Sequence, residues 1–168
     1  MKTPLQIVVG SVVFFAIAPG TVAGWIPYRL SGWRLGPPLV GMPGERAAGA
    51  ALVVMGAAVL VDCFVQFARQ GRGTPAPIAA PDTLVISGLY RHVRNPMYVA
   101  IVAALAGQAL LFGSRLVVAY TIVVWSAFHS FVYLYEEPAL RRRFGPDYDT
   151  YRAHVPRWWP RLTPWQGR

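Results

Sequence analysis

The chain has 168 residues, of which 55% are hydrophobic and only 14% are charged, and its mean hydropathy is +0.40. A soluble domain of this size cannot hide that much apolar surface, so the composition excludes an ordinary soluble protein and predicts one integral membrane domain over residues 1–168. The net charge of +9 does not predict a nucleic-acid partner, because the arginines cluster beside apolar runs, where membrane topology and anionic lipid headgroups account for them.

Four apolar runs are predicted to cross a bilayer as helices, and each is near the length of about 20 residues that a membrane-spanning helix needs. They cover residues 5–26, 47–67, 96–112 and 116–135. The first run is expected to be a retained helix and not a cleaved signal peptide, because its apolar core is long and three more runs follow. The predicted fold class is therefore all-α, with four transmembrane helices.

The basic residues set the expected orientation. With the N-terminus inside, twelve of them lie on the inner side and four, Arg29, Arg34, Arg46 and Arg115, on the outer side. This distribution predicts that both termini are cytoplasmic. A composition rich in Ala, Arg, Gly and Pro with few lysines indicates a bacterial cytoplasmic membrane.

Two segments lie outside the predicted spans. Residues 69–95 contain three prolines and are too interrupted for a long helix. After Tyr135, apolar residues recur at helical spacing although Gly145 and Pro146 interrupt them, which predicts a bent amphipathic helix on the inner membrane surface.

The third and fourth runs are joined only by Gly113, Ser114, Arg115 and their neighbours, so they are expected to form an antiparallel hairpin. The start of the third run and the end of the fourth then share the cytoplasmic face. Because packed helices lie about 8–10 Å apart, Asn95 and the Glu136–Glu137 pair are expected to contact one small ligand.

Asn95 and Pro96 have the pattern of an N-cap followed by proline in the first helical turn. The helix N-terminus, together with Arg91 and Arg94, predicts an anion site. The alternative is that these arginines only mark the membrane edge and bind lipid phosphate.

Glu136 and Glu137 are expected to end the fourth span, with Pro138 stopping the helix. One reading is that a glutamate accepts hydrogen bonds from ribose hydroxyls or an amino group. The other is a salt bridge from Glu137 to Arg141, four residues on. His129 and Tyr133 share a helical face with Glu136 at α-helical spacing, which predicts that all three point inward from the mouth of a pocket.

Most of the remaining polar and small residues in the spans are interpreted as structural. Asp62 is expected to pair with an arginine or a hydrogen-bond donor. Cys63 is interpreted as filler, and as the only cysteine it excludes an internal disulfide and a cysteine-based zinc site, so no metal site is predicted. Small residues are interpreted as helix-packing contacts: Gly49, Gly56, Ala103 and Gly107.

Two blocks of the sequence resemble the superfamily of isoprenylcysteine carboxyl methyltransferases and phospholipid methyltransferases. The first block runs from Leu84 to Tyr98 and contains Gly88, Tyr90, Arg91, Arg94, Asn95 and Pro96. The second runs from Glu136 to Arg157 and contains Glu137, Leu140, Phe144, Gly145, Tyr148, Tyr151, Val155 and Pro156. The likeness covers residues 75 to about 160, half of the chain, and the first two spans match nothing specific. The main departure is Asn95, where histidine is commoner; asparagine does not titrate near neutrality.

The resemblance implies an S-adenosylmethionine-dependent methyltransferase that holds its cofactor at the cytosolic face, in a region of about residues 84–160. The implied cofactor-binding residues are Tyr90, Arg91, Arg94, Asn95, Pro96, Tyr98, Glu136, Glu137, Tyr148 and Tyr151. Arg157 and Glu137 are the implied catalytic residues, with Arg157 orienting the acceptor. The implied partners are the bilayer and a lipophilic acceptor such as an isoprenylcysteine carboxylate, a phospholipid amine or another isoprenoid.

Two other functions stay open at this point. Sterol-reductase tails also place Tyr and Pro-Arg motifs after the last helix, so a membrane reductase that uses NADPH is one alternative. A non-catalytic membrane protein or a small transporter is the other. For Tyr148, Tyr151, Trp158 and Trp159, composition alone favours simple anchors at the membrane interface.

Overall fold

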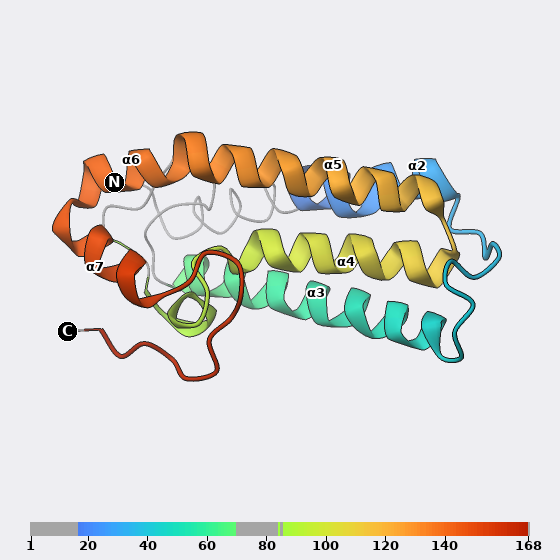
Figure 1. The fold of residues 1–168 in the computed structure, drawn as a ribbon, viewed down its shortest axis with the longest axis horizontal. Helices are drawn as coiled ribbons and strands as arrows, with labels where there is room; N and C mark the ends of the chain where they lie inside the picture. The colour runs from blue at the N-terminus through green and yellow to red at the C-terminus, as the bar shows by residue number, and fades with distance from the viewer. Residues whose placement is uncertain (1–16, 70–83, 85, 168) are drawn as a thin grey trace.

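The computed structural model describes residues 17–69, 84 and 86–167, and within these residues the chain is helical and contains no strand (Figure 1). The predicted all-α class is confirmed for this part of the chain. The elements follow one another in the order η1 (Gly20–Trp25), α2 (Ile26–Ser31), α3 (Glu45–Arg69), η3 (Gly88–Arg91), α4 (Pro96–Phe112), α5 (Arg115–Phe131), η4 (Val132–Glu136), α6 (Glu137–Phe144) and α7 (Pro146–His154). Of these, η1 and η4 are π-helical turns and η3 is a 3-10 turn.

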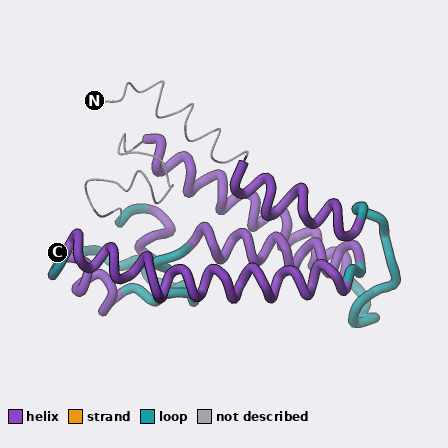
Figure 2. Tube along the Cα trace, turned by 90° about the horizontal axis from the view of Figure 1, so that it is seen from above, coloured by secondary structure: helices purple, strands orange, loops and turns teal. Residues whose placement is uncertain are grey.

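The helices agree with the predicted apolar runs where they can be compared. Most of the first run, residues 5–16, lies outside the described residues, and its described part continues through η1 and α2 to Ser31. The second run falls within α3, and the third coincides with α4. Figure 2 shows these helices running along one common direction, with loops at the two ends.

The largest helix–helix contact is between α3 and α4, and glycines let the two backbones approach each other. A Cβ atom on Gly49 would lie 2.7 Å from the carbonyl oxygen of Gly107, and one on Gly56 would lie 2.7 Å from that of Ala100. Real side chains do not tolerate such distances, so only glycine fits. The predicted packing role of Gly49, Gly56 and Gly107 is confirmed.

The reversal between α4 and α5 takes only two residues. Gly113 adopts a left-handed conformation with φ of 67°, and a Cβ atom there would overlap the carbonyl oxygen of Pro37. Ser114 then caps α5, because its side chain accepts a hydrogen bond from Val117 N over 3.4 Å. As a result, α5 runs back along α4 and returns the chain to the end where α4 begins.

Pro138 does not end the helix as predicted. The chain stays helical from Arg115 to Phe144, because the π-helical turn η4 shifts the hydrogen-bond register just before the proline. Pro138 therefore falls in the first turn of α6, where no backbone N–H is needed for the helical ladder. The helix breaks only at Gly145, so the predicted bend in the tail is found between α6 and α7.

Within the described residues, two helices are long and apolar enough to cross a membrane by length and composition, Glu45–Gln66 and Arg115–Phe144. The apolar helix α4 is shorter, with 17 residues. Both long helices present large apolar side chains to the outside, among them Val54, Met55, Ile122 and Val123. These exposed apolar faces fit contact with lipid and support association with a membrane.

In the part of the chain that the structure describes, buried residues form two clusters. One lies between α3, α4 and α5 and contains Leu60, Ala100, Ile101, Leu105 and Val124. The other fixes the tail and contains Tyr148, Tyr151 and Val155, with Leu84, Ile86, Leu140, Phe144 and Trp165 packed against them. The second cluster anchors α7 and the chain after it against the segment that precedes α4.

Candidate active site

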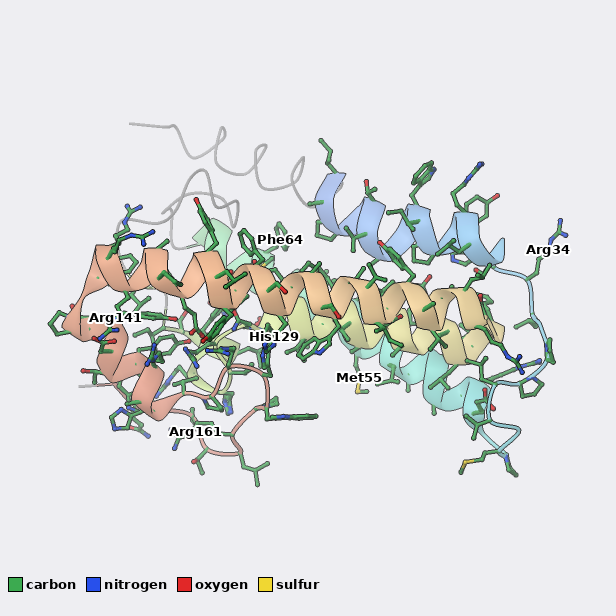
Figure 3. All side chains as sticks on the ribbon, turned by 45° about the horizontal axis from the view of Figure 1, so that its top comes forward. Arg34, Met55, Phe64, His129, Arg141 and Arg161 are labelled. Carbon is green, nitrogen blue, oxygen red and sulfur yellow. The ribbon has the colours of Figure 1, made fainter. Side chains whose placement is uncertain are left out.

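Polar and charged side chains gather at the end of the bundle that carries Arg141 and Arg161 (Figure 3). Tyr98 Oη donates to Glu136 Oε2 over 2.9 Å, and Arg94 Nη1 donates to Glu137 Oε1 over 2.7 Å. These two contacts join the start of α4 to the junction of η4 and α6. The structure therefore places the Arg94–Asn95–Pro96 corner beside the two glutamates.

Glu137 is the buried centre of an ion cluster and is only 6% exposed. Besides the contact with Arg94, it accepts two hydrogen bonds of 2.7 Å from Arg157, one from Nε and one from Nη2. These hydrogen bonds raise the pKa of Arg157 above its usual value. Two guanidinium groups facing one carboxylate leave one positive charge of the cluster unbalanced.

The predicted alternative for Glu137, a salt bridge to Arg141, is wrong. Arg141 Nε lies 3.0 Å from Asp149 Oδ1 on the exposed side of α6. Glu137 starts α6 on the inward side, and Arg94 and Arg157 reach it there in place of Arg141.

A cavity of about 390 Å³ opens beside this cluster, within the size range of small-molecule sites. Arg94, Asn95, Tyr98 and Glu136 contribute its polar groups. The lining consists of Ala18, Pro19, Val22, Tyr90, Arg94, Asn95, Met97, Tyr98, Ile101, Ala127, Phe128, Phe131 and Glu136. One side of the cavity is therefore polar and the other is apolar and aromatic.

Five of the predicted cofactor-binding residues do not line this cavity: Glu137, whose contacts are given above, and four others. Pro96 is buried at the start of α4. The Arg91 side chain turns to the tail, where its Nε donates to the carbonyl oxygen of Trp165 over 2.6 Å. Tyr151 Oη donates to the carbonyl oxygen of Tyr90 over 2.7 Å. Tyr148 is 2% exposed, with its Oη 3.4 Å from Arg94 Nη1. Tyr148 and Tyr151 thus contact Arg94 and Tyr90, which do line the cavity.

Asn95 occupies the predicted N-cap position, with Pro96 in the first turn, but its side chain makes no cap hydrogen bond. Its Nδ2 instead donates to the carbonyl oxygen of Arg157 over 3.1 Å, and Arg94 N donates to the carbonyl oxygen of Pro156 over 2.9 Å. Residues at the start of α4 thus fix the backbone of the tail at Pro156 and Arg157.

The predicted common face of His129, Tyr133 and Glu136 is wrong. His129 and Tyr133 are exposed and stack on each other, and Trp158 of the tail stacks on His129 at 5.8 Å. Only Glu136 lines the cavity. The π-helical turn η4 inserts an extra residue between Tyr133 and Glu136, so the α-helical spacing used for the prediction does not hold there.

Several residues at the site carried no specific sequence signal. Met97, Phe128 and Phe131 line the cavity but read as ordinary apolar residues of spans, and Val22 comes from the first helix. Trp158, on the other side of α5, packs against Trp125 with ring centroids 4.6 Å apart.

Two buried nitrogens have no hydrogen-bond partner within the described part of the chain, Arg94 Nε and Trp158 Nε1. A buried donor without an acceptor is unfavourable. Arg94 also lines the cavity, so its guanidinium group supplies the positive charge among the described lining residues.

Comparison with known proteins gives the family. No curated protein and no solved structure matches the chain. A family model described as phospholipid methyltransferase matches residues 45–147, which run from the start of α3 into α7. The expectation that the second span matches nothing specific is therefore wrong, since α3 lies inside the matched region. This match covers more than half of the chain and includes the cavity-lining residues of α4, α5 and η4, so the chain belongs to the phospholipid methyltransferase family of membrane methyltransferases.

Proposed function

We propose that this protein transfers a methyl group from S-adenosylmethionine to a lipophilic acceptor at the cytosolic face of a membrane. The proposal includes four spans, at about residues 5–26, 47–67, 96–112 and 116–135, in a bacterial cytoplasmic membrane with both termini inside. One observation carries it: within the region that the family model matches, Arg94, Tyr98 and Glu136 line a single cavity of about 390 Å³.

The lining fits a cofactor that joins an amino acid to a nucleoside. The guanidinium group of Arg94 suits a carboxylate. Glu136 suits a hydroxyl or amino group, and its carboxylate is held in place by Tyr98. The rings of Tyr98 and Phe128, with centroids 4.6 Å apart, offer faces that attract a cationic sulfur. We therefore assign cofactor contact to Tyr90, Arg94, Asn95, Tyr98 and Glu136.

The other predicted residues take supporting roles in this proposal. Pro96, Arg91, Tyr148 and Tyr151 fix the backbone and side chains around Arg94. Glu137 acts as a positioning residue, because both of its oxygens accept hydrogen bonds from Arg94 and Arg157. It holds the two guanidinium groups close together despite their like charge.

Arg157 faces the acceptor in this proposal. Its Nε and Nη2 are engaged by Glu137, so bidentate binding of an acceptor carboxylate through that edge is not available. The remaining positive charge of the cluster attracts an anionic group such as a carboxylate or a lipid phosphate.

S-adenosylmethionine, when bound, supplies a methyl group on a sulfonium, whose in-line displacement needs orientation and a dry pocket more than covalent help. The apolar wall formed by Met97, Phe128 and Phe131 excludes water and suits a lipid chain that enters sideways from the bilayer. A carboxylate acceptor needs no base. An amine acceptor must lose a proton, and Glu136 is the carboxylate among the described lining residues that could take it.

The first test is cofactor binding by the purified protein in detergent micelles. We expect S-adenosylhomocysteine to raise the melting temperature and NADPH to leave it unchanged. Glu136→Gln should abolish most of the shift. The matched control is Asp149→Asn, the same chemical change at the same end of the molecule but on the exposed side of α7. A shift with NADPH instead would favour the reductase.

The second test follows the methyl group. Methyl-labelled S-adenosylmethionine is incubated with the protein in vesicles made from total membrane lipid extract, and the lipids are then separated. We expect the label in a lipid fraction, which would also identify the acceptor. Label that stays on the cofactor would contradict a lipid acceptor.

A further inference from the structure

The tail after α7 turns back along the helix bundle instead of leaving it, as the red end of the chain in Figure 1 shows. Three contacts fix its path along η4 and α5. The Arg157 guanidinium lies 5.4 Å from the ring centroid of Tyr133. The Trp158 ring lies 5.8 Å from that of His129 and 4.6 Å from that of Trp125. From Arg157 to Trp158 the tail thus moves away from the ion cluster and toward the middle of α5.

The position of Trp158 along α5 gives its depth in a bilayer. A hydrocarbon core about 30 Å thick, counted from Arg115 at the start of α5, ends near residue 135. His129 lies eight residues before Glu137 and Trp125 lies twelve before it, or about 12 Å and about 18 Å along a helix. Trp158 contacts both, so its ring lies at the depth of the hydrocarbon core, in the same leaflet as the candidate active site.

Non-helical backbone is tolerated at that depth only where protein groups satisfy its hydrogen bonds, and this tail meets that condition to a large degree. Three of its residues are prolines and have no N–H to satisfy: Pro156, Pro160 and Pro164. The segment before α4 pairs with the backbone of the other turns. Arg161 N donates to the carbonyl oxygen of His92 over 3.0 Å, and Trp165 N donates to that of Arg91 over 2.9 Å.

The side chains between these fixed points face outward. Trp159 is 84% exposed and Leu162 is 98% exposed, the two largest values among the exposed large hydrophobic residues of the described chain. Their exposure does not come from a loose segment, because the backbone on both sides is hydrogen-bonded to the protein. Two large apolar side chains held outward on the segment that carries the Trp158 ring have lipid chains as their natural neighbours.

We infer that residues 156–165 lie within the cytosolic leaflet and that Trp159 and Leu162 contact the acyl chains of the bilayer. The inference rests on the membrane placement proposed above but not on methyl transfer or on any cofactor. The same segment carries Arg157, so the lipid contact and the acceptor side of the candidate active site belong to one rigid piece of chain. The tail then connects the lipid contact to the ion cluster beside the cavity.

The test uses fluorescent labels on single cysteines of the full-length protein. The one native cysteine is removed by Cys63→Ser, and the environment-sensitive dye NBD is attached to Trp159→Cys or Leu162→Cys. Val123→Cys, on the exposed apolar face of α5, is the reference for lipid contact, and Arg142→Cys, on α6, is the reference for water. Each protein is placed in phosphatidylcholine–phosphatidylglycerol vesicles with or without a nitroxide midway along one acyl chain, and iodide is the quencher from water. Circular dichroism confirms that each variant is folded.

The inference predicts that the labels at positions 159 and 162 lose most of their emission to the acyl-chain nitroxide and little to iodide, as the label at position 123 does. Labels quenched by iodide like the one at position 142 would overturn it. Labels protected from both quenchers would mean that protein covers the tail, for example a second copy of the chain, and would also overturn it. If position 123 escapes the nitroxide as well, the membrane placement itself is wrong, which separates that failure from a failure of the tail alone.

Discussion

Two buried carboxylates, one at each end of the helix bundle, are satisfied in opposite ways. Glu45, at the start of α3, is 8% exposed and accepts backbone N–H groups from Leu39 at 2.7 Å, Val40 at 3.1 Å and Gly41 at 2.9 Å. Glu137, at the start of α6, accepts three hydrogen bonds from two arginine side chains. The number of hydrogen bonds is the same, but the partners are neutral in one case and charged in the other.

The difference separates a structural carboxylate from a functional one. Glu45 closes the loop between α2 and α3 on itself, and its three donors are backbone groups with no further task. Glu137 holds Arg94, which lines the cavity, and Arg157, which the tail carries, and the cluster keeps an unbalanced positive charge. A buried carboxylate that gathers cations beside a cavity therefore marks a site, whereas one that gathers backbone amides marks a loop.

Glu137→Gln is expected to have the largest effect of the substitutions that test this comparison. The substitution removes the charge that Arg94 and Arg157 share, and breaking a nearly buried pair such as Arg94–Glu137 costs about 3–5 kcal/mol. We expect a large fall in melting temperature together with loss of S-adenosylhomocysteine binding. Calorimetry and a binding titration in the same detergent measure the two effects. Full stability with full binding would show that Glu137 is not the centre of the cluster.

Glu45→Gln should destabilise the protein by less. One amide oxygen still accepts from part of the loop, while the amide nitrogen cannot, so at least one backbone N–H of the loop loses its acceptor, and because Val40 and Gly41 are exposed, water can replace it. The fraction of protein that stays folded should bind S-adenosylhomocysteine with unchanged affinity. Denaturation gives the first value and isothermal titration the second. Weakened affinity in the folded protein would remove the distinction between the two carboxylates.

The sequence predicts the helices well but only part of the site. The long apolar runs predict α3 and α4, because few other structures need apolar runs of that length. The short connection at Gly113 is enough to predict that the chain comes back to the neighbourhood of Asn95 when it reaches Glu137. The sequence does not predict that Arg94 and Arg157 pair with Glu137, because any of several arginines could reach that carboxylate.

The failures have identifiable physical causes. The predicted common face of His129, Tyr133 and Glu136 assumes uninterrupted α-helical spacing. The π-helical turn η4 changes that spacing, so the three residues do not share one face. Phe128 and Phe131 line the cavity, yet in the sequence they look the same as residues that face lipid. The tail that folds back on Trp125 has no periodic pattern that could reveal its path.

Tyr98→Phe sharpens the comparison at the other glutamate. It removes the hydrogen bond to Glu136 Oε2 but keeps the ring that packs on Phe128. A hydrogen bond to a charged group contributes about 1.5–3 kcal/mol, part of which water recovers in an open cavity, so we expect S-adenosylhomocysteine affinity to fall by about tenfold. Global stability should change little. Unchanged affinity would mean that the orientation of Glu136 does not matter for binding.

The smallest effect is expected from Asp149→Asn, which removes a third kind of carboxylate. Asp149 pairs with Arg141 at 3.0 Å, but the side chains are 42% and 60% exposed. Exposed ion pairs contribute about 0–1 kcal/mol because water and salt screen them, so melting temperature and cofactor affinity should both stay close to those of the unaltered protein. Asp149→Asn removes one negative charge, as Glu137→Gln does, at the same end of the molecule. A large effect here would mean that net charge at this end of the molecule governs binding, and the distinction drawn from burial and partners would no longer hold.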